Sequence, residues 1–191
     1  MKYILSLSLV CLCLLGKAQN DSKDVKFINS VLDTTILFRA KGFYSDKISY
    51  HQIDEMRESL NKDTLFSNNW PKREVTYLVF STEERAHINR EIDKFINFKW
   101  RDGLVPQLKM ISADTIKSIF ADRLKSWRYF YNKYGLYIHE FTKPIFLRNN
   151  TICIFYKQFV CGDLCGFGTF DVYLLKEGKW VAEYHISSWI S

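Results

Sequence analysis

The chain has 191 residues, of which 27 are basic and 21 acidic, and its formal net charge is +6. Hydrophobic residues make up 47% of it and aromatic residues 16%, which is enough apolar surface for one well-packed domain. A basic balance is compatible with nucleic-acid binding, but acidic and basic residues alternate here as they do on an ordinary solvated surface. We therefore expect no nucleic-acid partner.

The first residues have the features of a secretory signal peptide. A short basic start, Met1–Tyr3, precedes the apolar run Ile4–Leu15, and small residues precede Gln19. This run is too short to anchor the chain in a bilayer, and no later run approaches that length. We expect residues 1–18 to be removed and residues 19–191 to form a single exported domain, periplasmic or extracellular, with no membrane span.

Four helices are predicted in chain order. Apolar residues recur at helical spacing in Ser22–Ile36, Tyr50–Leu60, Thr82–Phe98 and Asp114–Tyr134. Ser49 and Ser81 each stand before a helix with Gln or Glu three residues later, which is the pattern of a capping box. In the last and longest helix Ile116, Phe120 and Trp127 form a stripe, and we expect this stripe to pack on a sheet.

β-Branched and aromatic residues dominate the last third of the chain. Tyr137–Phe141 predicts a strand and Arg148–Asn150 a turn, and Glu74–Phe80 also has strand character. Three further runs in Thr151–Ser191, separated by a glycine-rich loop and by the turn at Glu177–Gly178, predict a meander. The sequence thus predicts an α+β fold, with three to four N-terminal helices packed on a C-terminal three- to four-stranded antiparallel meander.

The first loop of this meander has the most unusual composition in the chain. It contains Cys161, Gly162, Asp163, Cys165, Gly166 and Gly168. Two cysteines so close together in an exported chain indicate a structural disulfide, with free thiols as an alternative. Redox or zinc sites favour Cys-x-x-Cys or a second close pair of ligands, and neither is present. In one interpretation the disulfide only closes the end of a long hairpin. In the other, the glycines and the aspartate of this loop form a binding site, because glycine permits close approach of a partner.

No residue set in the sequence specifies a reaction. Four histidines are scattered, at His51, His87, His139 and His185. The side chains of His139 and Glu140 point to opposite faces of a strand and therefore cannot share a metal. Cys153 lies inside a strand run and should be a buried, inert thiol. No nucleophile motif surrounds Ser187 and Ser188, and no Lys-Ser/Thr pair follows the glycines to bind phosphate. We predict no catalytic residue, no metal and no cofactor.

Several segments of the chain carry a resemblance to known proteins. They are Trp127–Gly135, Phe141–Phe146, Thr151–Tyr156, Cys161–Gly168 and Gly178–Trp180. Together they resemble a group of uncharacterised exported proteins of Bacteroidota, in which the Ala18–Gln19 junction is also common. This resemblance implies export and implies no catalytic residue. The ending from Glu177 to Trp189 is similar to the last strands of nuclear-transport-factor-2-like cone folds. The triplets that begin at Asp33, Asp63 and Asp114 resemble the O-glycosylation motif of exported Bacteroidota proteins.

Two classes of function follow from these features. The first is a non-catalytic module of the cell envelope that binds a protein, a glycan or a small ligand. The alternative is a small-molecule pocket protein or enzyme of the cone type, in which the sheet curls around an aromatic cavity. A closed cavity with a buried carboxylate or histidine of shifted pKa would favour the second class. A flat sheet with a filled core would favour the first.

Overall fold

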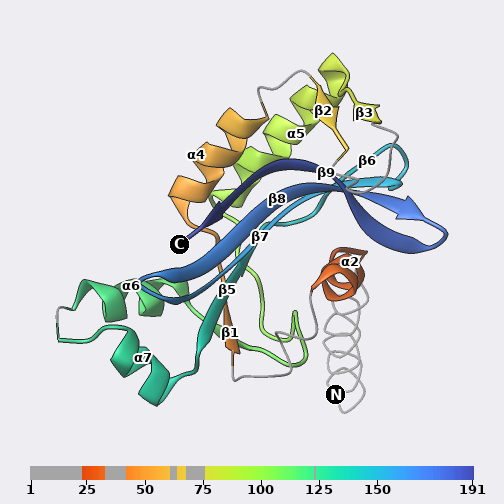
Figure 1. Cartoon of the computed structure of the whole chain (residues 1–191). Coiled ribbons are helices and arrows are strands. Elements are labelled where there is room, and N and C mark those ends of the chain that lie inside the picture. Colours follow the sequence, from red (N-terminus) through yellow and green to blue (C-terminus); the bar gives the residue numbers. More distant parts are fainter. Residues whose placement is uncertain (1–22, 33–41, 61–63, 68–75, 123) are drawn as a thin grey trace, which may run out of the picture.

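The computed structural model describes residues 23–32, 42–60, 64–67, 76–122 and 124–191. A seven-stranded mixed sheet organises this part of the chain (Figure 1). Its strands are β1 Gly42–Ser45, β4 Lys109–Ile111, β5 Tyr137–Phe141, β6 Ile145–Leu147, β7 Ile152–Gly162, β8 Cys165–Lys176 and β9 Lys179–Ile190. They lie in the order β4-β1-β5-β7-β8-β9, with β6 beside β7. A second, two-stranded sheet pairs β2 Leu65–Phe66 with β3 Tyr77–Leu78.

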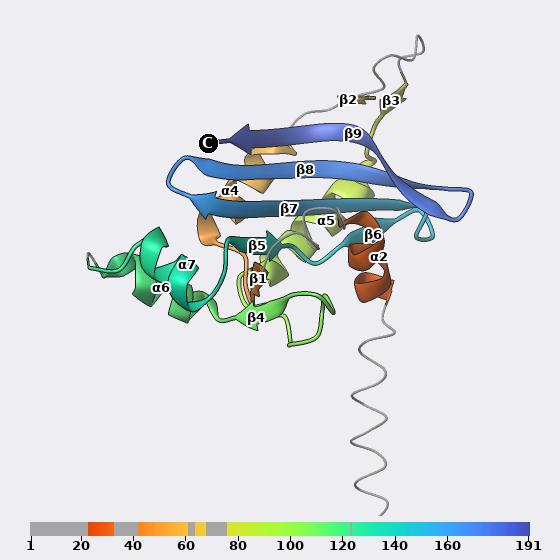
Figure 2. The ribbon, with the colours of Figure 1, turned by 60° about the horizontal axis from the view of Figure 1, so that its bottom comes forward.

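Five helices surround the sheet in the described residues. They are α2 Lys23–Val31, α4 Tyr50–Ser59, α5 Thr82–Phe95, α6 Ala113–Ala121 and α7 Trp127–Lys133. None of these described helices is long and apolar enough to cross a membrane. The helices α6 and α7 lie at the end of the molecule where the β7–β8 hairpin turns, as both views show (Figure 2).

The predicted antiparallel meander is wrong as a description of the whole sheet. Its three C-terminal runs do form β7, β8 and β9, which are antiparallel neighbours. However, β1 comes from the N-terminal half and lies between β4 and β5, parallel to both. A strand of four residues is too short for its alternation to be recognised, and its partners lie far along the chain. The mixed character of the sheet therefore has no local signal in the sequence.

The two faces of the sheet are covered by different helices, because alternate residues of a strand point to opposite faces. On one face Ile154 of β7 packs in a cluster with Ile53 of α4 and Ile92 of α5. On the other face Phe155 packs against Phe27 of α2, whose ring also meets three further aromatic rings edge to face. Figure 1 shows α4 and α5 on the side of the sheet opposite to α2. The core is thus filled on both sides of β7.

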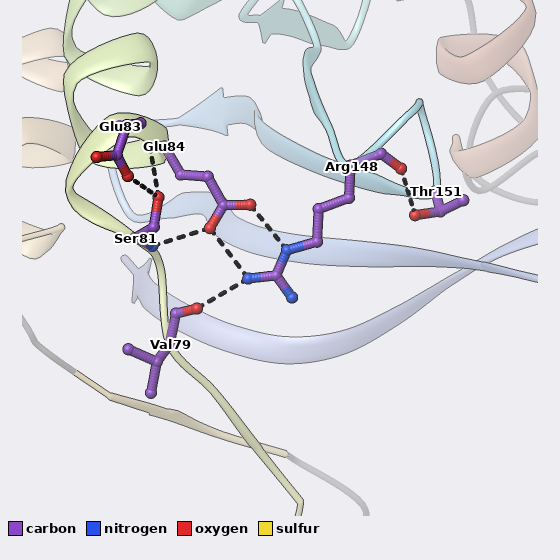
Figure 3. Close-up of polar contacts among 6 residues, drawn as sticks. All are labelled: Val79, Ser81, Glu83, Glu84, Arg148 and Thr151. Atoms are coloured by element: carbon purple, nitrogen blue, oxygen red, sulfur yellow. Dashed lines mark hydrogen bonds and ion pairs between the residues drawn. The ribbon is translucent and has the colours of Figure 1, made fainter.

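A polar clamp joins the start of α5 to the turn before β7 (Figure 3). Ser81 and Glu84 form the predicted capping box, since the Ser81 amide donates to Glu84 Oε2 at 2.9 Å and Ser81 Oγ accepts from the Glu84 amide. Arg148 donates from Nε to Glu84 Oε1 at 2.7 Å and from Nη2 to the Val79 carbonyl at 2.9 Å. The turn predicted at Arg148–Asn150 is confirmed by three successive positive φ angles.

The predictions for the first three helices agree with α2, α4 and α5 apart from their ends, and Ser22 and residues 33–36 of the first prediction lie outside the described residues. The capping box predicted at Ser49 is absent, because the Ser49 hydroxyl bonds to the Gln52 side chain and caps no backbone amide. The strand predicted at Glu74–Phe80 is limited to Tyr77–Leu78 in the described residues. The predicted signal peptide lies outside these residues, as do the triplet that begins at Asp33 and the first residue of the triplet that begins at Asp63.

The long helix predicted at Asp114–Tyr134 is wrong, because the chain forms two helices there. Asp122 has an extended backbone (φ −85, ψ 112), and its carboxylate accepts a hydrogen bond from the Leu124 amide at 3.0 Å. An aspartate that bonds the nearby backbone competes with helical hydrogen bonding. Ile116 and Trp127 still pack on the end of the sheet, whereas Phe120 stays 38% exposed.

Candidate functional site: a groove between α4 and β9

A groove of about 220 Å³ lies between α4 and the C-terminal strands. Its lining residues come from α4, β7 and β9: Glu55, Met56, Glu58, Ser59, Tyr156, Ser187, Ser188 and Trp189. Drug-sized ligands occupy pockets of roughly 300–1,000 Å³. The groove is therefore suited to one small group, such as a single side chain, an amine or a sugar ring.

Trp189 is positioned by two glycines of the predicted binding loop. A Cβ atom at Gly166 would lie 2.9 Å from Cη2 of Trp189, and one at Gly168 would lie 2.8 Å from its Cε2. Real Cβ atoms do not approach so closely, so the indole occupies space that any other residue at these positions would fill. Gly166 and Gly168 are buried and thus support a wall of the groove without lining it.

A chain of hydrogen bonds leads from Trp189 into the sheet. The indole Nε1 of Trp189 donates to the Tyr156 hydroxyl at 2.8 Å, and this hydroxyl donates to Gln158 Oε1 at 2.6 Å. The Gln158 amide donates to Glu140 Oε2 at 2.9 Å. Burial raises the pKa of Tyr156 to about 12, so its hydroxyl keeps its proton at physiological pH. The chain fixes the orientation of Tyr156 and Trp189.

Glu140, at the far end of this chain, is the most perturbed carboxyl group in the described residues. Burial raises its pKa to about 7, and hydrogen bonds from the Ser49 backbone and from Gln158 act in the opposite direction. A carboxyl group that titrates near neutral pH is typical of acid–base sites. However, Glu140 does not line the groove and reaches it through Gln158 and Tyr156. We therefore assign it a positioning role.

The charge of the groove is negative, in contrast to that of the whole chain. Among the described residues, its lining includes Glu55 and Glu58 and no basic residue. His51 Nε2 lies 3.1 Å from Glu55, while Arg57 pairs with Asp93 of α5 at 2.6 Å. Carboxylates next to an indole can hold a cation by charge and by cation–π attraction.

The loop predicted as a binding site is a compact, crosslinked hairpin. Cys161 and Cys165 lie at disulfide distance, with their Cα atoms 5.1 Å apart. The Tyr131 hydroxyl of α7 donates to the Cys161 carbonyl, and a Cβ atom at Gly162 would lie 3.2 Å from the same hydroxyl. Asp163 is exposed at the turn. The loop residues do not line the groove; Gly166 and Gly168 act on it through Trp189.

The remaining residues singled out in the sequence have structural surroundings. His139 is 6% exposed, and burial lowers its pKa to about 4, so it stays neutral in the core. Cys153 is fully buried, and burial raises its pKa, as expected for an inert thiol. His185 lies beside a carboxylate of the neighbouring strand, with its Nδ1 2.9 Å from Oδ1 of Asp171. Within the described ranges no three metal-ligating side chains lie together.

Sequence reasoning did not identify Glu55, Glu58 or Glu140 as site residues. The two glutamates of α4 stand three positions apart on a helix rich in charged residues, which looks like any solvated face. Glu140 has no sequence signal beyond its place next to His139 in a strand. The one available signal is the combination of Trp189 with Gly166 and Gly168. The two glycines lie on the neighbouring strand and leave the space that the large indole ring occupies.

A scan against protein-family models, a search of curated proteins and a search of solved structures each gave no match. The resemblances to exported Bacteroidota proteins and to nuclear-transport-factor-2-like folds stay predictions.

Proposed function

We propose that the protein is an exported binding module, and that the groove between α4 and β9 holds a positively charged group of its ligand. The observation that carries this proposal is that two acidic residues, Glu55 and Glu58, line the same groove as the aromatic residues Trp189 and Tyr156. The sequence of residues 1–18 and the Cys161–Cys165 pair support export.

Binding is favoured over catalysis by the placement of the titratable groups. Glu140 has the shifted pKa expected of a catalytic group, but Gln158 and Tyr156 separate it from the groove. A general acid or base must reach the reacting proton directly or through one water. The groove is also open at the sheet edge and is not a closed cavity inside a curled sheet.

The test uses a matched pair of probes, N-acetylarginine amide and its neutral isostere N-acetylcitrulline amide. We expect the indole N–H resonance of Trp189 to shift on titration with the arginine probe and not with the citrulline probe. The double variant Glu55→Gln/Glu58→Gln should weaken arginine binding at least tenfold, since each charged contact contributes about 1 kcal/mol. Asp163→Asn, a carboxylate outside the groove, is the control and should bind normally. Equal shifts with both probes would refute a cation site.

A further inference from the structure

The groove opens beside an exposed edge of the sheet. β9 is the last strand of the sheet order, and its outer side is bridged at Tyr184 by Ser67. Beyond this bridge, toward Ile190, no described strand lies alongside it. The Ser67–Tyr184 bridge is antiparallel, so another segment of the chain already pairs with this edge at one position.

The direction of the backbone groups near the groove follows from the pairing of β8 and β9. The Gly166 and Ser191 amides each donate to the other's carbonyl, so these two residues form a hydrogen-bonded pair. Such pairs alternate along an antiparallel ladder, and the register aligns Gly168 with Trp189. Ile190 lies between these two hydrogen-bonded pairs, and Ser188 lies on the other side of Trp189. By the same alternation, both residues direct their N–H and C=O groups away from β8, toward the exposed edge.

This edge lacks the charged and proline residues that protect many edge strands, although a register shift between Phe170 and Asp171 places a bulge at Ile186. Beyond this bulge, Ser187–Ile190 pair with β8 in regular register. Lysine, proline or inward-pointing charges normally prevent a further strand from pairing. The stretch Tyr184–Ser191 contains no Lys, Arg, Asp, Glu or Pro. The opposite edge of the sheet, in contrast, is the three-residue strand β4, which begins with Lys109.

The edge and the groove share residues, which links the two features. Ser188 directs its backbone outward and also lines the groove, opposite the carboxylates of Glu55 and Glu58 on α4. A strand added alongside Ser188 would direct every second side chain toward α4. Strand addition of this kind draws its affinity from main-chain hydrogen bonds and its specificity from pockets for alternate side chains.

We propose that the ligand is an extended peptide segment of a partner protein, which pairs with β9 at Ser188 and Ile190 and places an arginine or lysine side chain in the groove. This inference rests on the proposed function, because it identifies the class of ligand that the same groove binds. A second copy of this chain fits less well as the occupant, since Tyr184–Ser191 offers no basic side chain to Glu55 and Glu58.

The test uses a fluorescent, acetylated and amidated heptapeptide of alternating threonine and valine with arginine at its centre. We expect it to bind at least tenfold more tightly than N-acetylarginine amide, and the same peptide with a central glutamate to bind at least tenfold more weakly. Two further peptides are N-methylated on alternate sets of backbone amides. A paired strand directs one set toward β9, so one methylated peptide should lose binding and the other should keep it.

The matched variants are Ser188→Pro and Ser188→Ala. Proline removes the outward N–H group of residue 188 and breaks no hydrogen bond to β8, and edge strands tolerate such a change. We expect Ser188→Pro to abolish the additional affinity of the heptapeptide over the arginine probe. We expect Ser188→Ala to preserve it. Equal binding by both methylated peptides, or no gain over the arginine probe, would overturn strand addition while groove binding stands. If neither the heptapeptide nor the arginine probe binds, both proposals fail. A dimer in sedimentation that Ser188→Pro abolishes would identify a second copy as the occupant and overturn the peptide.

Discussion

At the scale of single residues, the protonation of Glu140 links the groove wall to pH. Its pKa of about 7 in the folded protein is higher than the ordinary value of 4.5, so the folded state binds a proton more tightly than the unfolded state between these pH values. The free energy of unfolding should therefore fall as pH rises from 4.5 to 7 and change little above it. Over this range the group accounts for at most about 3 kcal/mol.

Glu140→Gln removes this titration, because the glutamine amide does not ionise in this pH range. Its carbonyl oxygen can still accept the hydrogen bond from Gln158. Urea unfolding between pH 5 and pH 8 should show a clearly smaller slope of stability against pH in the variant than in the native protein. The control is Asp163→Asn, which removes an exposed carboxylate at the hairpin turn and should keep the native slope. An unchanged slope in Glu140→Gln would contradict the assignment.

Gly168 is the second residue on which the groove depends. In Gly168→Ala the new methyl group would overlap the Trp189 indole, so the ring must move and its bond to the Tyr156 hydroxyl must break. We expect a loss of about 1–3 kcal/mol in stability, as in other overpacked sites, and a shifted indole N–H resonance of Trp189. Gly162→Ala is the control, because its methyl group would meet the Tyr131 side chain and not Trp189. If Gly168→Ala leaves the indole resonance in place, the glycines do not position the wall.

At the scale of elements, the clamp of Arg148 and Glu84 holds α5 on the sheet (Figure 3). The bond to Arg148 is the largest cause that lowers the Glu84 pKa. Because the pKa of Glu84 is lower in the folded than in the unfolded protein, its ionised form stabilises the fold at pH values above the unfolded pKa. This stabilisation is lost as the pH falls through the folded pKa. Because Arg148 is 42% exposed, we expect Arg148→Ala to cost only about 1 kcal/mol at pH 7.

The part of this cost that comes from the ion pair should shrink as the pH falls and Glu84 takes up a proton, whereas the bond from Arg148 to the Val79 carbonyl does not depend on that proton. Paired denaturation curves at pH 7 and at pH 3 measure this difference. Arg90→Ala, an exposed arginine on the same helix α5, should change stability by less than 0.5 kcal/mol at either pH. A cost for Arg148→Ala that is equal at both pH values would mean that it reflects the bond to Val79 and packing alone.

The elements that the sequence predicts well are those with strong local signals. The capping box at Ser81 and the alternation in Thr151–Ser191 depend on residues a few positions apart, and α5 and β7–β9 follow from them. The errors arise where a side chain competes with helical hydrogen bonds and where partners lie far apart along the chain. The hydrogen bond from the Leu124 amide to the Asp122 carboxylate divides the long helix, and β1 pairs with a strand about 95 residues further along the chain. The groove joins α4 to β9 across the chain, so no local pattern reveals it.

At the scale of the whole molecule, charge and shape are unevenly distributed. The chain is basic overall, with a net charge of +6, yet its groove carries two glutamates. Both faces of the sheet are filled, by α4 and α5 on one side and by α2 on the other. The recognition features that remain are therefore an edge of the sheet and a groove next to it. This arrangement supports the proposal that the protein is a binding module.

Removing the Cys161–Cys165 crosslink measures how much of the stability depends on it. Cys161 and Cys165 are four residues apart, and closing so small a ring constrains the unfolded chain by about 2 kcal/mol. The double variant Cys161→Ser/Cys165→Ser should lose this amount or less in urea unfolding, because the β7–β8 ladder and the bond from Tyr131 to the Cys161 carbonyl persist. Binding of N-acetylarginine amide should change by less than twofold, since the cysteines do not line the groove. The native protein in reductant is the control and should match the variant. A loss of binding in the variant with Trp189 undisturbed would instead show that the loop itself contacts the ligand.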